Sequence, residues 1–345
     1  MSPIPNGRVI FNEAPLAEGY PDAQKTLVYE SNQTMDVETT PLNGGILVKT
    51  LVVSIDPYLR GRLRNPEKQS YNEAFVLGQP ITSYSIAVVL RSENTNVKAG
   101  DHLYGNFPLV EYHILKDLTG AKKIENKEGI PWSLYTGIAG MPGKTAYYGW
   151  KAYAKPKKGE TIFVTTGAGP VGSMVIQLAK LDGLKVIASA GSPEKVQFMK
   201  DIGADVAFNY KTESTDEILE KHGPIDIYWD HVGGEVLDLA FKHAARFARF
   251  IEVGLITGYN TGGIQPVKNF GNVLFKSLTI QGFIVGNLDA EYSEAFYNEI
   301  PARIARGEIK YLEYVKHGLQ SAGQVLVDVL KGDNIGKAVI IVADK

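Results

Sequence analysis

The chain has 345 residues, of which 44% are hydrophobic and 21% charged, with 36 basic against 38 acidic side chains. This is the balance of an ordinary globular protein long enough for two domains, and a net charge of -2 argues against nucleic-acid binding. With no apolar run long enough for a bilayer and no secretory pattern at the start, we expect a cytoplasmic protein without a membrane partner. The absence of cysteine excludes disulfides, a cysteine nucleophile and a thiolate zinc site.

Residues 1 to about 130 predict a small, irregular, mostly β domain. Short β-branched runs alternate with turn residues, and the predicted strands lie at 9–11, 26–29, 45–54, 86–91, 102–104 and 110–114. Pro57 ends the third of these strands, and the following residues up to Arg62 show no clear period. This segment is either a surface loop with solvated arginines or a loop that faces a cleft, and the sequence favours neither.

Residues 131–150 are rich in glycine, tyrosine and tryptophan, and we expect a helix from Thr145 onwards. The run 155–159 is then a loop before a different kind of sequence begins. We place the domain boundary near residue 133.

A strand, a glycine turn, a helix and a second strand follow between 159 and 195. Residues 161–165 are short, apolar and β-branched, as in a buried parallel strand, and 185–189 repeat that pattern. Between them lies Gly-x-Gly-x-x-Gly, formed by Gly167, Gly169 and Gly172, and then a helix with apolar residues at helical spacing from Val171. These glycines allow the tight turn, the close approach of a pyrophosphate and the close packing of helix on strand. In this context the motif indicates a dinucleotide site at the helix N-terminus.

The rest of the middle segment continues an α/β rhythm that predicts a doubly wound parallel Rossmann sheet. Predicted strands lie at 206–209, 225–230, 247–253 and 278–283, and predicted helices at 193–201, 215–221, 235–245 and 291–306. From Ile309 the chain again predicts β structure, with a helix at 320–331 and a final strand at 338–342. This last part does not extend the sheet naturally, so we expect it to return to the first domain.

The end of the second strand decides between nucleotides. An NAD site of this fold places a carboxylate there for the ribose 2′-OH, whereas this chain has Ala190, Gly191 and Ser192. Lys195 lies one turn into the next helix and suits a 2′-phosphate, and Tyr210 follows the third strand at the same end. We therefore favour NADPH over NAD. A methyltransferase that uses S-adenosylmethionine is disfavoured, since it needs an acid at the same place.

Several separate motifs resemble one protein family. The glycine turn and the β-rich first domain resemble the medium-chain dehydrogenase/reductase superfamily. More narrowly, the chain resembles the zinc-independent prostaglandin reductases and NADPH-dependent alkenal double-bond reductases, over the segments 54–60 (SIDPYLR), 140–147 (GMPGKTAY), 190–195, 208–211, 230–235 and 332–337. The resemblance covers almost the whole chain and is specific to the family, not to a substrate.

The resemblance implies an α/β fold in three segments. These are a GroES-like catalytic domain (1–133), a Rossmann NADP-binding domain (134–312) and a C-terminal segment that returns to the catalytic domain (313–345). It also implies a homodimer joined partly through the Rossmann sheets. The implied reaction is the NADPH-dependent reduction of the carbon–carbon double bond of small α,β-unsaturated aldehydes or ketones.

The resemblance also implies roles for individual residues. Tyr259 matches the catalytic tyrosine near the nicotinamide and the substrate carbonyl, and Tyr58 matches a tyrosine that lines the substrate cleft. The cofactor-binding positions are Gly167, Gly169, Val171, Gly172, Ser192, Lys195, Tyr210, His231, Tyr259 and Asn334.

The chain departs from the family at His231, where Asn is common. This histidine could donate a hydrogen bond to the cofactor as Asn would, titrate near neutral pH, or be satisfied by backbone as an ordinary strand-end residue. The sequence leaves these alternatives open.

Without cysteine, and with six histidines that show no metal-ligand spacing, the chain is expected to have no catalytic metal. Reduction of an enone needs only hydride delivery to the β-carbon and a hydrogen-bond donor for the enolate oxygen, for which the Tyr259 hydroxyl is the first candidate. Two other functions stay open, an NADPH quinone reductase and a nucleotide-binding redox sensor without turnover.

Overall fold

The computed structural model describes residues 3–344, which divide into two compact units. The β unit comprises residues 3–137 and 313–344, and the Rossmann unit comprises residues 138–312. Each is described by itself. The functional names expected for the segments 1–133, 134–312 and 313–345 stay predictions.

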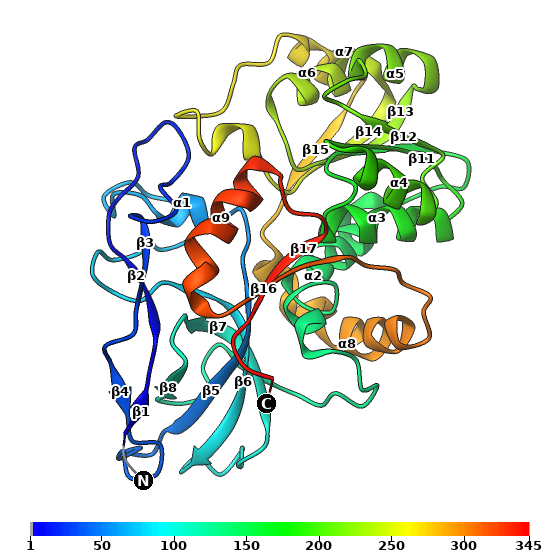
Figure 1. Cartoon of the computed structure of the whole chain (residues 1–345). Helices are drawn as coiled ribbons and strands as arrows, with labels where there is room; N and C mark the ends of the chain where they lie inside the picture. The colour runs from blue at the N-terminus through cyan, green and yellow to red at the C-terminus, as the bar shows by residue number, and fades with distance from the viewer. Residues whose placement is uncertain (1–2, 345) are drawn as a thin grey trace. The chain divides into compact units, whose positions relative to one another are not determined.

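The Rossmann unit is built on a six-stranded sheet in which every neighbouring pair is parallel (Figure 1). In spatial order the strands are β12 (Val206–Asn209), β11 (Lys185–Ala190), β10 (Thr161–Val164), β13 (Ile225–Asp230), β14 (Ala244–Glu252) and β15 (Thr279–Gly282). The order 3-2-1-4-5-6 is that of the doubly wound fold, so the predicted fold class is confirmed. Ligands of such sheets bind at the carboxyl ends of the strands, where the strand order reverses beside β10.

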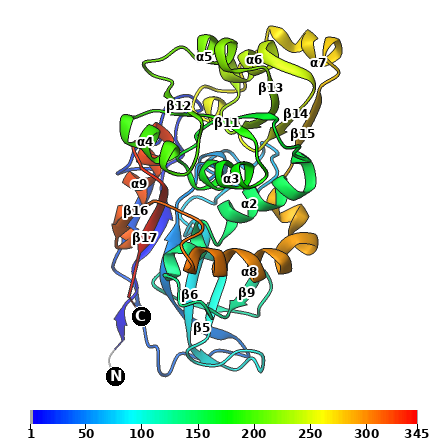
Figure 2. The same ribbon diagram turned by 90° about the vertical axis from the view of Figure 1, so that its right-hand side faces the viewer.

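Helices cover both faces of this sheet (Figure 2). On one face Phe163 of β10 and Phe250 of β14 belong to a buried cluster with Leu219 and Phe241 from two helices, α5 and α6. The other face carries α3 and α4. The α-helices of the unit are α2 (Met141–Gly149), α3 (Pro170–Leu181), α4 (Pro193–Asp201), α5 (Thr215–His222), α6 (Gly234–His243), α7 (Asn272–Phe275) and α8 (Asp289–Ala305).

The helix expected from Thr145 is present as α2, but it begins at Met141, four residues earlier than predicted. Pro142 lies in the first turn, where a proline costs no hydrogen bond. A Cβ at Gly143 would clash with the Ile138 carbonyl oxygen, so only glycine allows the backbone of residue 138 to lie this close to α2. Glycine and proline here mark a helix start and a tight contact rather than a turn.

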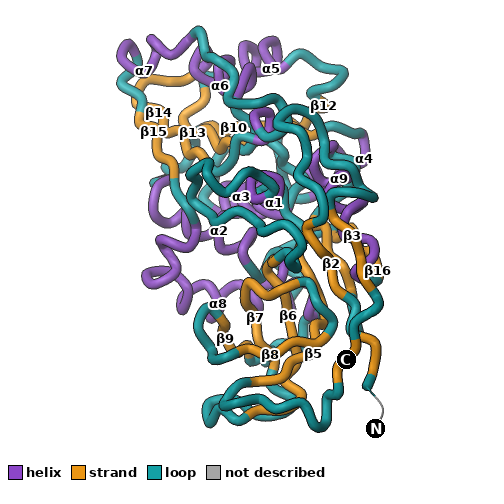
Figure 3. Tube along the Cα trace, turned by 90° about the vertical axis from the view of Figure 1, so that its left-hand side faces the viewer, coloured by secondary structure: helices purple, strands orange, loops and turns teal. Residues whose placement is uncertain are grey.

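The β unit contains a seven-stranded sheet (Figure 3). Its path is β16 (Glu313–His317), β17 (Lys337–Ile341), β5 (Ile46–Ser54), β6 (Thr82–Ser92), β7 (His102–Pro108) and β9 (Ala121–Ile124), with β8 (Tyr112–Leu115) paired to β5. Thus β17, from the end of the chain, is antiparallel to β5 from its beginning. The remaining strands and α-helices are β1 (Ile4–Pro5), β2 (Arg8–Phe11), β3 (Leu27–Glu30), β4 (Thr34–Met35), α1 (Leu59–Arg62) and α9 (Ala322–Lys331).

The segment after Pro57 is not a loop of solvated arginines. It forms the short helix α1, and Arg60 is only 6% exposed. Its guanidinium donates to the Leu16 carbonyl oxygen at 2.8 Å, and Arg62 donates to the Glu73 carbonyl oxygen at 3.0 Å. Both arginines therefore fasten neighbouring loops through backbone acceptors. A single helical turn is too short to give a period in the sequence.

Within residues 3–344, no helix has the length and apolar character that crossing a membrane requires.

Candidate functional site: the carboxyl edge of the Rossmann sheet

The glycine turn joins β10 to α3 in a conformation made by backbone hydrogen bonds. Thr166 has a positive φ of 48°, and the Gly167 N–H donates to the Ser189 carbonyl oxygen of β11 at 2.9 Å. Gly169 is the N-cap of α3 in an extended conformation and is followed by a proline. The N-cap supplies no capping side chain, so none competes there with an anion for the first N–H groups of the helix, including that of Val171.

The three glycines of the turn leave little room for side chains. A Cβ at Gly172 would lie 2.6 Å from the Thr166 carbonyl oxygen, and one at Gly169 would lie 3.2 Å from the same atom. A Cβ at Gly167 would lie 2.5 Å from the Met199 sulfur of α4. The turn is thus a bare backbone cradle before a helix N-terminus, which fits a dinucleotide pyrophosphate.

The end of β11 carries no carboxylate for a ribose 2′-OH. Ser192 is the N-cap of α4 and accepts a hydrogen bond from the Lys195 N–H at 3.4 Å. The carboxylate of Glu194 is bound by its own N–H and by the Ser192 side chain, which hold the pKa of Glu194 below its usual value. The nearby acid is therefore part of the helix cap.

Tyr210 and Lys211 lie against the backbone at this end of β11. A Cβ built at Gly191 would lie 3.0 Å from the Tyr210 hydroxyl and 3.1 Å from Cε of Lys211. Lys211 was missed by the sequence reasoning, although it directly follows Tyr210. The absence of an acid and the presence of these groups fit a 2′-phosphate.

His231 follows β13 and is held by the end of β10. The backbone N–H of His231 donates to the Thr165 hydroxyl at 2.9 Å, and the ring Nδ1 is 2.7 Å from the Thr165 carbonyl oxygen. Because a carbonyl only accepts, Nδ1 carries the proton and Nε2 is left as an acceptor. Nε2 is buried and has no partner among the described residues.

Burial lowers the pKa of His231 to about 4, so the ring is neutral at pH 7. The lowered pKa disfavours titration near neutral pH, and a role of His231 toward the cofactor stays a prediction. The only donor of the neutral ring, Nδ1–H, is used by the Thr165 carbonyl oxygen, which agrees with the expectation of a histidine satisfied by backbone. A buried acceptor remains at Nε2.

Tyr259 lies in the loop that follows β14, and this loop contacts the turn after β13. The Ile256 N–H donates to the His231 carbonyl oxygen at 3.1 Å, and the Thr257 N–H donates to the Val232 carbonyl oxygen at 3.2 Å. The Tyr259 hydroxyl would lie 3.5 Å from a Cβ built at Gly254, within the same loop. Burial raises the pKa of Tyr259, so its hydroxyl keeps its proton and can act as a donor at neutral pH.

The structure therefore brings most of the predicted cofactor residues to one edge. The glycine turn, Ser192, Tyr210, His231 and Tyr259 each follow the carboxyl end of a strand in the same parallel sheet. This edge is where doubly wound sheets bind their ligands.

Two predicted residues, Tyr58 and Asn334, belong to the β unit. Tyr58 is bound by the Ser83 side chain, and burial followed by the charge of Asp56 raises its pKa. The Asn334 side chain donates to the Gly336 carbonyl oxygen at 2.8 Å, in the turn before β17. Their expected roles stay predictions.

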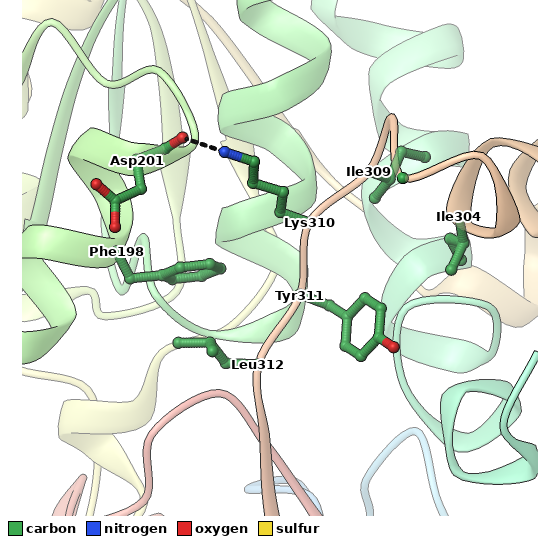
Figure 4. Close-up of a pocket in the computed structure, with 8 residues that line it drawn as sticks. Phe198, Asp201, Ile304, Ile309, Lys310, Tyr311 and Leu312 are labelled. Carbon is green, nitrogen blue, oxygen red and sulfur yellow. Dashed lines mark hydrogen bonds between the residues drawn. The ribbon is translucent and has the colours of Figure 1, made fainter.

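A surface pocket lies elsewhere in the Rossmann unit (Figure 4). It is lined by Phe198 and Asp201 of α4, Ile304 of α8 and the segment 307–312, and Lys310 Nζ donates to the Asp201 carbonyl oxygen at 3.1 Å. Helix α4 starts at the carboxyl end of β11 and runs back along the sheet, so its last turn lies toward the opposite edge. The pocket is therefore separate from the residues described above.

No group of three or more His, Asp or Glu side chains suited to a metal ion occurs in the described part of the chain.

Comparison with known proteins agrees with this geometry. A family model described as zinc-binding dehydrogenase matches residues 170–300, and one described as N-terminal domain of oxidoreductase matches residues 20–124. The chain is 39% identical to the NADP(+)-dependent 2-alkenal reductase of Nicotiana tabacum over 99% of this chain and 98% of that protein. It is 34% identical to prostaglandin reductase 1 of Rattus norvegicus over 90% of this chain and 95% of that protein.

A solved structure extends the comparison to the fold. The crystal structure of CurA from Vibrio vulnificus in complex with NADPH has a TM-score of 0.88 and 28% identity, and covers 98% of this chain and 100% of that one. Fold and site thus define an oxidoreductase of the medium-chain dehydrogenase/reductase class. Within that class, the chain belongs to the family of prostaglandin reductases and NADP-dependent alkenal double-bond reductases.

Proposed function

We propose that the protein reduces the carbon–carbon double bond of α,β-unsaturated aldehydes or ketones with NADPH. The observation that carries this proposal is the 39% identity to a 2-alkenal reductase over 99% of the chain. The bare glycine turn, the acid-free end of β11 and a neutral, partly buried tyrosine at the same sheet edge support it. The substrate partner is a small unsaturated carbonyl compound.

The nucleotide is held along the carboxyl edge of the Rossmann sheet. The N–H groups at the start of α3 bind the pyrophosphate over Gly169, Val171 and Gly172. Lys195, Tyr210 and Lys211 bind the 2′-phosphate around the end of β11, where Ser192 shapes the start of α4. His231 offers the acceptor Nε2, which suits a donor of the cofactor.

Bound NADPH supplies the hydride that reduces the β-carbon of the substrate. Negative charge then develops on the carbonyl oxygen. The Tyr259 hydroxyl donates a hydrogen bond to that oxygen, and this stabilises the enolate as it forms. Burial keeps the hydroxyl protonated, so the donor is in place before the reaction starts. The enolate then becomes the saturated carbonyl compound when its α-carbon takes up a proton, from the tyrosine or from water.

The β unit completes the proposal. Tyr58 lines the substrate cleft and Asn334 contacts the cofactor, as their motifs in the family imply. Burial raises the pKa of Tyr58, so this side chain is also a neutral donor.

The proposed protein is a cytoplasmic homodimer. β15 is an edge strand, and apolar side chains near it are exposed, among them Phe247, Leu274, Phe275, Ile280 and Ile284. An unpaired apolar edge is a surface that a second copy can cover by extending the sheet. Light scattering of the purified protein should give twice the mass of the chain.

The direct test supplies NADPH or NADH with a 2-alkenal, an aryl enone and a quinone, and identifies the products. We expect the saturated carbonyl compound, with NADPH strongly preferred. Consumption with the quinone alone would identify a quinone reductase instead. Binding of NADPH without turnover of any acceptor would favour a redox sensor.

Lys195→Ala should raise the KM for NADPH by about tenfold or more, because one charge-assisted hydrogen bond contributes about 1.5–3 kcal/mol. Lys211→Ala should raise it less, since Lys211 is exposed. Neither variant should change the KM for NADH by more than about twofold. Lys200→Ala, an exposed lysine of the same helix as Lys195, is the matched control. Equal weakening of both nucleotides would place the 2′-phosphate elsewhere.

Tyr259→Phe should lower kcat by about 10- to 100-fold without abolishing turnover, because one donor to the enolate oxygen is lost. NADPH affinity, measured separately by fluorescence, should stay close to that of the parent enzyme. Unchanged kcat and affinity would remove Tyr259 from the active site.

A further inference from the structure

Two carboxyl groups face each other where β13 and β14 end. Asp230 and Glu252 are the last paired residues of these parallel strands. Asp230 is 0% exposed, and both carboxyl oxygens of Glu252 are buried. Glu252 belongs to none of the predicted sites and stands at a mainly apolar strand end.

The available hydrogen-bond donors all serve Asp230. Its Oδ1 accepts from the Tyr228 hydroxyl at 2.9 Å, the Val232 N–H at 2.7 Å and the Gly233 N–H at 3.0 Å. In contrast, no donor within residues 3–344 reaches either oxygen of Glu252. A buried carboxylate without donors is costly, so Glu252 is the member that holds a proton, with Asp230 as its acceptor.

The charges around the pair agree with this assignment. Burial, followed by the charge of Asp230 and a hydrogen bond with it, raises the pKa of Glu252 to about 9. Burial also raises the pKa of Asp230, but its hydrogen bonds with Gly233, Val232, Tyr228 and Glu252 act in the opposite direction. Asp230 is the only charged group of the described chain that contributes to the Glu252 pKa.

Other titratable groups lie near the pair. His231, directly after Asp230, is neutral over the alkaline range, because burial lowers its pKa to about 4. Tyr228 of β13 stays neutral, because burial raises its pKa well above the usual value. On α6, Asp238 accepts from the N–H groups of Lys268 and Asn269, and Glu235 is exposed. β15 faces Glu252 with Gly282, which has no side chain to titrate.

Asp230 and Glu252 lie where the loop after β13 contacts the loop after β14. Directly after Glu252, the N–H groups of Val253 and Gly254 donate to the Asp230 carbonyl oxygen at 3.0 and 3.2 Å. Between Gly254 and Tyr259 the chain crosses the turn after β13. There the Ile256 and Thr257 N–H groups donate to the carbonyl oxygens of His231 and Val232. Separation of the two carboxyl groups would therefore shift one loop against the other.

We propose that protonated Glu252 is a positioning residue. Its hydrogen bond to Asp230 holds the Tyr259 loop (residues 253–259) in place against the His231 turn (residues 231–233), in the arrangement that binds the nicotinamide half of the cofactor. This rests on the proposed function, which places both loops there. Loss of the shared proton leaves two adjacent carboxylates that repel each other and open the contact between the two loops. The adenosine half, bound around the ends of β10 and β11, does not depend on it.

The test measures the Kd of NADPH by its fluorescence from pH 7.5 to 9.5, beside the Kd of 2′,5′-ADP by calorimetry. For the parent protein the Kd of NADPH should rise about fourfold over this range, as expected for one group that must stay protonated with a pKa of about 9. Glu252→Gln keeps the shape and an N–H donor for Asp230 but cannot ionise, so this rise should disappear. The Kd of 2′,5′-ADP should have the same pH profile in both proteins.

Glu220→Gln, an exposed acid of α5, is the matched control and should keep the rise. A rise that persists in Glu252→Gln would overturn the proposal. So would a parallel rise for 2′,5′-ADP that the substitution removes, since that indicates general loosening of the unit. Neither readout needs turnover, so a failure of enone reduction is seen separately in the product assay.

Discussion

Among the described residues, each unit contains a buried pair of ionisable groups, and these two pairs are built in opposite ways. In the β unit, Lys337 is 3% exposed and its Nζ lies 3.1 Å from Oδ1 of Asp56. The same ammonium donates to the Ile55 and Ala338 carbonyl oxygens at 2.8 and 2.7 Å, and the Ser54 hydroxyl donates to Asp56. Every charge in this pair has a partner of opposite sign or a hydrogen bond.

The Rossmann unit instead buries two acids, Asp230 and Glu252, with donors for only one of them. The ion pair of the β unit links β17 to the residues that directly follow β5. The acid pair holds together only while it keeps a proton. The difference predicts that the acid pair responds to pH in the mildly alkaline range, because burial and the neighbouring Asp230 raise the pKa of Glu252 to about 9.

The largest effect should come from breaking the ion pair. Lys337→Met removes the ammonium and leaves Asp56 and two backbone carbonyls buried without it, which should cost about 3–5 kcal/mol of unfolding free energy. Denaturant unfolding at pH 7 measures this loss. Lys98→Met, at an exposed lysine of the same unit, should change stability by less than about 0.5 kcal/mol. A loss below about 1 kcal/mol for Lys337→Met would show that the ion pair is not a stabilising link.

The Asp230–Glu252 pair should have a smaller effect on the unfolding free energy, and this effect should depend on pH. The folded protein keeps the Glu252 proton up to a pKa of about 9, whereas the unfolded chain releases it near 4.5. The group therefore stabilises the folded state most below pH 4.5, and this contribution is lost as pH rises toward 9, at up to about 1.4 kcal/mol per pH unit.

Glu252→Gln should remove that slope, so its stability relative to the parent should rise by about 3 kcal/mol between pH 6 and pH 8. Denaturant unfolding at several pH values, monitored through tryptophan fluorescence, makes the comparison. Parallel profiles for the two proteins would mean that Glu252 ionises freely in the folded state.

The smallest effect should appear on the acid side, where the two units behave alike. Burial lowers the pKa of His113 in the β unit and of His231 in the Rossmann unit to about 4 in each case. An unfolded histidine takes up its proton near 6.5, so stability is lost as pH falls from 6.5 toward 4.

His231→Asn should remove one such contribution, which is about 1.4 kcal/mol at pH 5.5. Its unfolding free energy at pH 5.5, taken relative to pH 7, should fall less than that of the parent. An equal fall in both proteins would show that His231 is protonated without penalty in the folded state.

The features that the sequence predicted well are local ones. The Rossmann strands were recognised because each is a short apolar run between turn residues, and the glycine turn because only Gly fits where a Cβ would meet the Thr166 carbonyl. Ser192 was recognised as an N-cap because capping depends on the next three residues.

The features that it missed depend on distant partners. Glu252 has its partner in Asp230 only through the register of two parallel strands, which no local pattern reports. Arg60 is buried because carbonyl groups from another loop meet its guanidinium. Likewise, the donor of His231 is used by Thr165, a residue at the end of another strand.

Following a labelled hydride tests the central claim most directly. NADPH that carries deuterium at the transferred position of C4 would be incubated with a 2-alkenal, and the product examined by mass spectrometry and NMR. The account predicts a saturated aldehyde with deuterium on its β-carbon. Deuterium on the former carbonyl carbon, in an allylic alcohol, would contradict it and identify a carbonyl reductase.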